Sequence, residues 1–148
     1  GDLPDLRIKY LDLLHKEAKL NEIVMLVGED VLPNESRLVL EISRVVKVGF
    51  LQQNAFNDTD TFVPLTKQFE MLKTIDLLYE EGKKALSENI PISIIRNDEI
   101  YGEVINMKYN IGNDQMDKFV ELNNKVRSFY SNLMVKYEVT EWKKNILH

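Results

Sequence analysis

The histidine and cysteine side chains of this chain are too few to predict a catalytic centre or a metal site. The only histidines are His15 and the final residue His148, and cysteine is absent. A transition-metal site usually needs several His or Cys ligands, and a nucleophile needs a base beside it. Asp58 and Asp60 alternate as in a calcium loop, but the glycine and the later glutamate of such a loop are missing. A self-contained enzyme that uses carboxylates is a remote alternative, since no carboxylate pair is marked out by the local sequence.

Phosphate chemistry would require a glycine-rich loop whose backbone N–H groups cradle the phosphates. The motifs GxxxxGK[ST] and GxGxxG are both absent, and the six glycines are scattered singly. The pair Gly82-Lys83 lacks the earlier glycine of such a loop. A net charge of −5 gives no basic face of the kind that nucleic-acid binders carry. We therefore expect neither a phosphate site nor a nucleic-acid partner.

Two sets of residues could bind a partner or a ligand without reacting with it. Glu29, Asp30 and Glu35 cluster at an expected turn, either as a solvated helix tip or as a contact surface for a partner. Composition favours the solvated tip. Phe56 and Phe62 lie in the polar, non-periodic segment 52–63, either as hydrophobic anchors or as an aromatic surface that stacks on a planar ligand. The pattern alone favours anchors.

The elements that position these residues are helices, because apolar residues recur at helical spacing along most of the chain. The first helix should begin near Pro4 and end at Gly28, and a second covers about 35–51, its last turn weakened by Gly49. A third helix begins at Pro64, a short one covers 92–109, and a long one begins after a cap at Asn113 or Asp114. The predicted fold is an all-α bundle of about five helices, formed by residues 1–148 as a single domain.

Composition agrees with this fold and bears on where in the cell we expect the chain to work. The chain has 148 residues, of which 44% are apolar and 29% charged, as in ordinary globular domains. No stretch approaches the ~20 apolar residues that a membrane-spanning helix needs, so we expect no direct membrane insertion. The lack of cysteine suits a cytoplasmic location.

The segment from residue 23 to residue 62 carries a family resemblance. Its strings IVMLVG (23–28), DVL (30–32), RL (37–38), FLQQNAF (50–56) and DTF (60–62) strongly resemble the catalytic A subunit of archaeal and vacuolar-type rotary ATPases. FLQQNAF is the most specific of these strings. Weaker similarity extends over the rest of the chain and is lowest after Asn110.

The resemblance implies the C-terminal helical domain of that subunit. The phosphate loop and catalytic residues of the family lie in a preceding nucleotide-binding domain, which is absent here. It implies ATP or ADP with Mg²⁺ in the intact subunit, and ATP synthesis or hydrolysis coupled to ion transport. It also implies non-catalytic B subunits and a central stalk as partners, at the cytoplasmic face of a membrane. We expect the 148-residue chain alone to be inactive and to bind no nucleotide tightly.

Two sets of residue roles follow from the resemblance. The turn 30–36 aligns by position with the acidic loop of the related F-type beta subunit, which bears on the rotating shaft. We therefore expect a stalk contact, made by five residues: Glu29, Asp30, Val31, Leu32 and Glu35. The segment with Phe56 and Phe62 resembles the one that closes over the adenine base, so one or both rings are expected in the adenine pocket. The alternative function is a free-standing helical adaptor that binds proteins without nucleotide chemistry.

Overall fold

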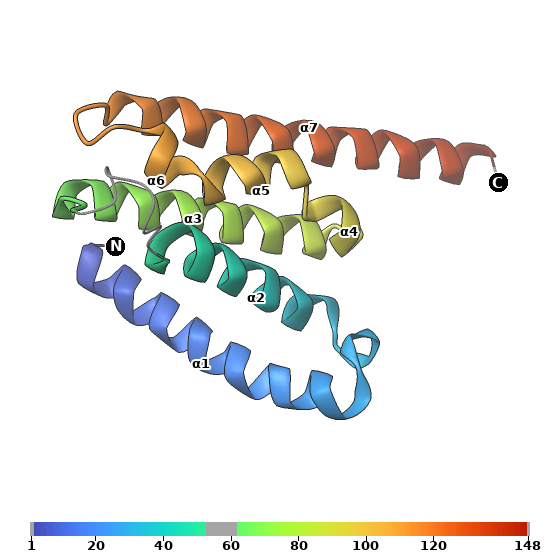
Figure 1. The fold of residues 1–148 in the computed structure, drawn as a ribbon. Coiled ribbons are helices and arrows are strands. Elements are labelled where there is room, and N and C mark those ends of the chain that lie inside the picture. The colour runs from blue at the N-terminus through green and yellow to red at the C-terminus, as the bar shows by residue number, and fades with distance from the viewer. Residues whose placement is uncertain (1, 53–61, 148) are drawn as a thin grey trace.

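The computed structural model describes residues 2–52 and 62–147, and these residues form helices connected by short turns (Figure 1). In chain order the α-helices are α1 (Leu3–Val27), α2 (Asn34–Val45), α3 (Leu65–Ser87), α4 (Ile92–Ile95), α5 (Asp98–Ile105), α6 (Met107–Asn110) and α7 (Asp117–Leu147). A 3₁₀ turn, η1 (Glu29–Val31), follows α1, and a π-helix, η2 (Val46–Leu51), follows α2. Within the two described ranges there is no strand, and five α-helices have eight or more residues. The predicted all-α fold is confirmed.

Helix α1 begins and ends where the sequence predicts. The side chain of Asp2 accepts a hydrogen bond from the backbone N–H of Asp5, and Pro4 lies in the first turn, where a missing N–H has no cost. Gly28 ends the helix with a φ of 89°, which glycine adopts without the steric penalty of a Cβ atom. The chain then reverses through η1 into α2, so α1 and α2 form a helical hairpin (Figure 1).

The last turn of the second helix is a π-helix, in which the backbone N–H of Gln52 bonds to the carbonyl of Lys47, five residues earlier. Gly49 lies in this turn and packs against α5. A Cβ atom at Gly49 would stand 3.1 Å from the Cα atom of Ile105. The glycine that the sequence marks as a weak point therefore permits a close approach between two helices.

The prediction of one helix over residues 92–109 is wrong, because α4, α5 and α6 occupy this segment. The side chain of Asn97 accepts a hydrogen bond from the backbone N–H of Ile100 and so starts α5. At the other end, the side chain of Asn106 donates to the carbonyl of Gly102. These local bonds break the segment into short helices, which can follow the surface of the bundle.

The expected cap at Asn113 or Asp114 is also wrong, because α7 begins only at Asp117. Gln115 accepts a hydrogen bond from the backbone N–H of Gly112 through its side chain, which closes a turn before the helix. The side chain of Asn113 bonds instead to Lys67 and to the carbonyl of Phe62. Tertiary contacts, which the local sequence does not reveal, thus decide where this helix starts.

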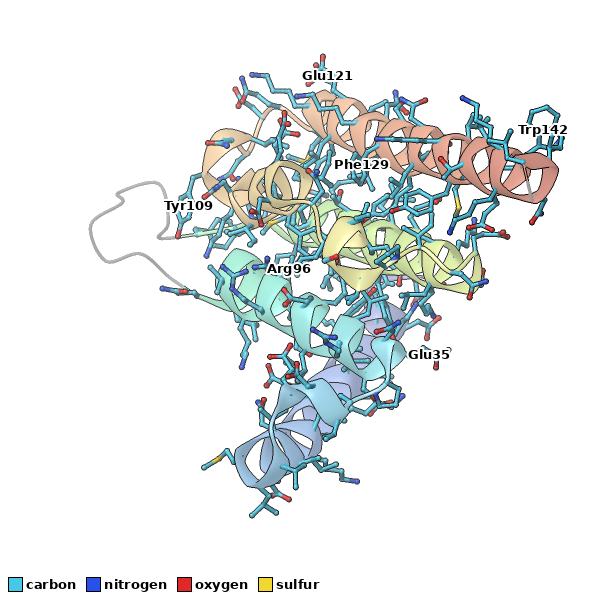
Figure 2. The ribbon with its side chains drawn as sticks, turned by 90° about the vertical axis from the view of Figure 1, so that its right-hand side faces the viewer. Glu35, Arg96, Tyr109, Glu121, Phe129 and Trp142 are labelled. Carbon is cyan, nitrogen blue, oxygen red and sulfur yellow. The ribbon has the colours of Figure 1, made fainter. Side chains whose placement is uncertain are left out.

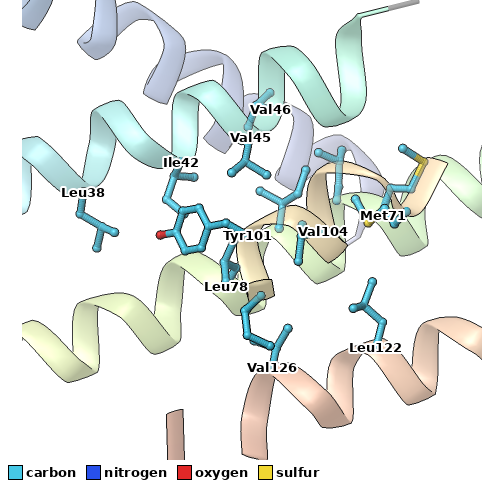
Figure 3. Packing of buried hydrophobic residues seen from close by; sticks show 14 of the residues in the cluster. Leu38, Ile42, Val45, Val46, Met71, Leu78, Tyr101, Val104, Leu122 and Val126 are labelled. Atoms are coloured by element: carbon cyan, nitrogen blue, oxygen red, sulfur yellow. The ribbon is translucent and has the colours of Figure 1, made fainter. Parts of the chain in front are cut away.

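The core lies where α2, α3, α5 and α7 meet. Figure 3 shows Tyr101 of α5 between Ile42 of α2 and Leu78 of α3, with Val126 of α7 on the opposite side of the same cluster. The predicted inward stripe of the last helix is mostly buried, and Tyr130 beside it is fully buried as well. Five residues form that stripe: Phe119, Leu122, Val126, Phe129 and Leu133.

The helical hairpin and α7 lie on opposite sides of α3 (Figures 1 and 2). Arg96, between α4 and α5, connects this part of the chain to α2 through an ion pair with Glu41. Nε of Arg96 lies 2.5 Å from Oε2 of Glu41. At the far end of α7, Trp142 projects away from the bundle. Among the described helices, none is both long and apolar enough to cross a membrane.

Candidate functional site

The turn between α1 and α2 forms the tip of the hairpin and carries the predicted stalk-contact residues. Glu29, Asp30, Val31 and Glu35 are exposed to solvent, while Leu32 is only 8% exposed. The carboxylate of Glu29 lies 3.8 Å from Nε of Arg37, a loose pair between half-exposed side chains. Leu32 thus supports the tip from inside, and the other four predicted residues face outward.

Further apolar residues extend this exposed tip, and the sequence analysis did not select them. The last turn of α1 exposes three consecutive residues, Met25, Leu26 and Val27, which join Val31 on the surface. A signal for this was present, because three consecutive apolar residues of a helix cannot all face the same core. Exposed apolar side chains of this kind are suited to packing against another protein surface.

The opposite end of the hairpin lies beside the start of α3, and Phe62, one of the two predicted adenine-pocket aromatics, lies there. Phe62 comes immediately before this helix, and its side chain is 70% exposed. Its neighbour Val63 packs against the core, and the Val63 carbonyl accepts a hydrogen bond from Gln68 at 2.9 Å. Phe56 falls outside the described residues, as do Asp58 and Asp60. The ring of Phe62 therefore lies on the surface, and the backbone beside it is held by a hydrogen bond. This differs from the hydrophobic anchor that the sequence pattern alone favours.

A buried lysine organises the segment that faces Phe62. Lys67 of α3 is 3% exposed, and its ammonium donates to the carbonyls of Lys108 at 2.8 Å and Ile111 at 2.6 Å. It also donates to the side-chain oxygen of Asn113 at 3.1 Å. The sequence alone gives little reason to expect a role for Lys67, because an isolated lysine near a helix start is usually solvated.

Both residues that flank segment 53–61 are bonded to residues 108–113. Nζ of Lys108 donates to the carbonyl of Gln52 at 3.1 Å, and the side-chain amide of Asn113 donates to the carbonyl of Phe62 at 3.3 Å. Lys67 in turn holds the carbonyl of Lys108 and the side chain of Asn113. These five residues form a connected set, which we call the Lys67 cluster.

An apolar cavity of about 350 Å³ opens on the same half of the molecule, between α1, η2 and α3. Ile8 and Leu11 of α1 and Leu51 of η2 line it and are exposed. Apolar surface of this kind is suited to packing against protein.

Several charged groups of the described residues cross-link helices. Lys9 of α1 donates to Asp76 and Glu80 of α3, and the hydroxyl of Tyr10 donates to the same Asp76. Burial and the bond to Asp76 raise the pKa of the Tyr10 hydroxyl far above its ordinary value of 10.0, so it stays protonated. Within the part of the chain that the structure describes, no three His, Asp or Glu side chains group as metal ligands do.

The comparison with known families agrees with this geometry. Residues 1–95 match the model of the C-terminal domain of V and A type ATP synthase. The chain belongs to this family. Its match covers the hairpin, η2 and α3, and thus both the exposed tip and the Phe62 end.

Individual relatives extend the similarity beyond residue 95. The V-type ATP synthase alpha chain 2 of Clostridium tetani is 52% identical over 136 residues, or 92% of this chain and 23% of the relative. The V-type ATP synthase alpha chain of Halothermothrix orenii is 48% identical over 133 residues, or 90% of this chain and 22% of the relative. The chain thus spans less than a quarter of the length of these members, and the predicted family resemblance is confirmed.

Proposed function

We propose that this domain works within the catalytic subunit of an A/V-type rotary ATP synthase, as a rigid link between the central stalk and the adenine end of the nucleotide site. The observation that carries the proposal is the layout of the α1–α2 hairpin. Its exposed tip lies at one end, and the Phe62 end lies beside the start of α3 at the other (Figure 1). Helix α1 has 25 residues, so at 1.5 Å per residue the two ends are roughly 37 Å apart.

Force transmission at the tip has a direct physical basis. Helices α1 and α2 pack on each other and on α3, and close-packed side chains resist compression. The exposed residues Met25, Leu26 and Val31 offer apolar contact to a shaft, and Glu29, Asp30 and Glu35 add weak, salt-sensitive steering. Leu32, being buried, contributes by keeping the turn in shape.

At the other end, the exposed ring of Phe62 offers a flat apolar face of the kind that stacks on a purine. The phosphates and Mg²⁺ of ATP or ADP would be held by the rest of the intact protein, and the cavity beside Ile8 and Leu11 gives that part a surface to pack on. The non-catalytic B subunits and the central stalk are the proposed partners, at the cytoplasmic face of the membrane. Membership of this family favours this proposal over a free-standing adaptor.

The role of the tip can be tested in the assembled enzyme with a pair of matched substitutions. Val31 at the tip is 58% exposed, and Val120 on α7 is 60% exposed. Neither Val31→Ser nor Val120→Ser should unfold the domain, because both side chains face solvent. We expect Val31→Ser to lower the torque and the coupling between ATP turnover and ion transport, and Val120→Ser to leave both unchanged. Equal coupling in the two variants, at low and at high salt, would remove Val31 from the shaft contact.

A further inference from the structure

We propose that Lys67 is a positioning residue that fixes the location of Phe62 through Asn113, so that the ring of Phe62 meets the adenine base at a defined place. This inference rests on the proposed adenine role of Phe62. It assigns Lys67 and Asn113 no contact with the nucleotide.

The burial of Lys67 is the first argument. Moving an ammonium group out of water is costly unless oxygen atoms replace the lost hydration, and at Lys67 two carbonyls and one amide oxygen do so at 2.6–3.1 Å. These three acceptors, all among the described residues, belong to one short stretch, residues 108–113. A cation placed among them therefore holds this stretch in one conformation against α3.

The orientation of the Asn113 amide is the second argument. An ammonium can only donate hydrogen bonds, so the oxygen of the amide must face Lys67 and its NH₂ group must point elsewhere. That NH₂ group donates to the carbonyl of Phe62 at 3.3 Å. Lys67 thus determines which way Asn113 points, and Asn113 determines where the backbone of Phe62 lies.

The second flank of segment 53–61 is held by the same cluster. The carbonyl of Lys108 accepts from Lys67, while the side chain of Lys108 donates to the carbonyl of Gln52. The positions of Gln52 and Phe62 therefore both depend on residues 108–113, and the conformation of residues 108–113 depends on Lys67.

The exposure of the Phe62 ring explains why such a support is needed. A buried ring is positioned by its own packing, but a ring that is 70% exposed is positioned mainly by its backbone. Fixing that backbone in advance lowers the entropy lost when a ligand stacks on the ring. The Lys67 cluster fixes the backbone of Phe62 from the side that faces the rest of the domain.

The test uses the assembled ATP synthase with Phe62→Ala, Asn113→Ala and the double variant. Phe62→Ala should raise KM for ATP about fivefold or more, the size expected for the loss of one base–aromatic stack, with kcat retained. Asn113→Ala should raise KM by at least about twofold but less than Phe62→Ala does. In the double variant KM should equal that of Phe62→Ala alone, because Asn113 acts only through Phe62.

The outcomes separate this inference from the proposed function. An unchanged KM in Phe62→Ala would overturn the adenine role of Phe62 and this inference together. A raised KM in Phe62→Ala with no effect of Asn113→Ala, or with independent effects in the double variant, would overturn the positioning role alone. Lys67→Met, which keeps an unbranched side chain but removes the ammonium group, should raise KM as Asn113→Ala does. Its control is Lys73→Met, at a lysine of the same helix whose side chain is 41% exposed and pairs with Glu70. If Lys67→Met prevents assembly, the comparison of Phe62→Ala, Asn113→Ala and the double variant still tests the positioning role.

Discussion

At the residue scale, Gly49 separates the effect of helix propensity from the effect of packing. Alanine is favoured over glycine in a helix by about 1 kcal/mol, so propensity alone predicts that Gly49→Ala stabilises the domain. The structure predicts the opposite, because the new Cβ atom would meet backbone atoms of Ile105 at 3.1 and 3.3 Å. Overpacking of this kind typically costs about 1–3 kcal/mol. Urea unfolding of the purified chain should therefore show a net loss of stability of about 1 kcal/mol or more.

Gly102 in α5 provides the matched control for this experiment. A Cβ atom at Gly102 would meet nothing within 4 Å, and the residue lies inside a helix. Gly102→Ala should accordingly raise the free energy of unfolding, by up to about 1 kcal/mol. If both alanine variants stabilise the chain, the close approach between η2 and α5 does not exist in solution.

Glu80 links the stability of the hairpin to pH. Burial opposes ionisation of its carboxyl group, but hydrogen bonds from Lys9 and Lys83, at 2.6 and 2.9 Å, outweigh burial and hold the pKa of Glu80 below its ordinary value of 4.5. A lowered pKa in the folded state stabilises the fold above pH 4.5, and this contribution is lost as the pH falls through the lowered pKa. Because the side chain of Glu80 is 41% exposed, solvent screening limits the contribution to about 1 kcal/mol or less.

The measurement is urea unfolding of Glu80→Gln at pH 7 and at pH 3. The variant should be less stable than the parent at pH 7, and the difference should shrink as the pH falls below 4.5. The control is Glu22→Gln, because Glu22 is an exposed residue of α1 that pairs with no charged group in the described part of the chain. A difference between Glu80→Gln and the parent that does not vary with pH would show that the ion pair has no part in it.

At the element scale, the hairpin tip depends on one inward side chain. Leu32 is 8% exposed and its neighbour Val31 is 58% exposed, although both are apolar and adjacent. Leu→Ala substitutions at buried sites cost about 2–5 kcal/mol, and at the edge of a bundle we expect the lower end of this range. Val31→Ala should change stability by less than about 0.5 kcal/mol. Urea unfolding of the two variants checks this difference, and a similar loss in both would place Leu32 outside the packed interior.

The sequence predicts the long elements well and the short ones poorly, for a physical reason. Helices α1, α3 and α7 repeat apolar residues over many turns, and glycine or proline marks the end of α1 and the starts of α1 and α3. Between residues 92 and 109 the side chains of Asn97 and Asn106 bond to the nearby backbone and divide the predicted single helix into short ones, which the apolar spacing does not reveal. The start of α7 depends on distant contacts, such as the bonds from Lys67 to Ile111 and Asn113, so no local pattern predicts it and the cap at Asn113 or Asp114 is wrong.

The same division applies to the candidate site. Charge and helix reversal mark the turn with Glu29 and Asp30, and family strings mark the segment that ends at Phe62. The Lys67 cluster depends on where α3 and the residues before α7 meet, which is settled only by the packing of the whole chain. The sequence therefore marks the exposed turn and the segment that ends at Phe62 as candidates, and it does not mark the buried residues of the Lys67 cluster.

At the scale of the whole molecule, the described residues expose apolar side chains at the hairpin tip and at Phe62, and the sequence has no glycine-rich phosphate loop. Phosphate contacts supply most of the affinity for a nucleotide, and the chain has no glycine-rich phosphate loop. One exposed ring at Phe62 can add only about 1–3 kcal/mol by stacking, which corresponds to weaker than millimolar binding when it acts alone. We therefore expect the purified chain to bind neither ATP nor ADP tightly, with or without Mg²⁺.

Isothermal titration calorimetry of the 148-residue chain with ATP, in Mg²⁺ and in EDTA, checks this expectation, and the intact catalytic protein serves as the positive control. Heat from micromolar, Mg²⁺-dependent binding to the chain alone would contradict it, because such affinity requires a phosphate site. Weak binding that is insensitive to Mg²⁺ and disappears in Phe62→Ala would instead fit a lone stacking ring. The domain would then contribute to nucleotide affinity only when the rest of the enzyme holds the phosphates and brings the adenine base against Phe62.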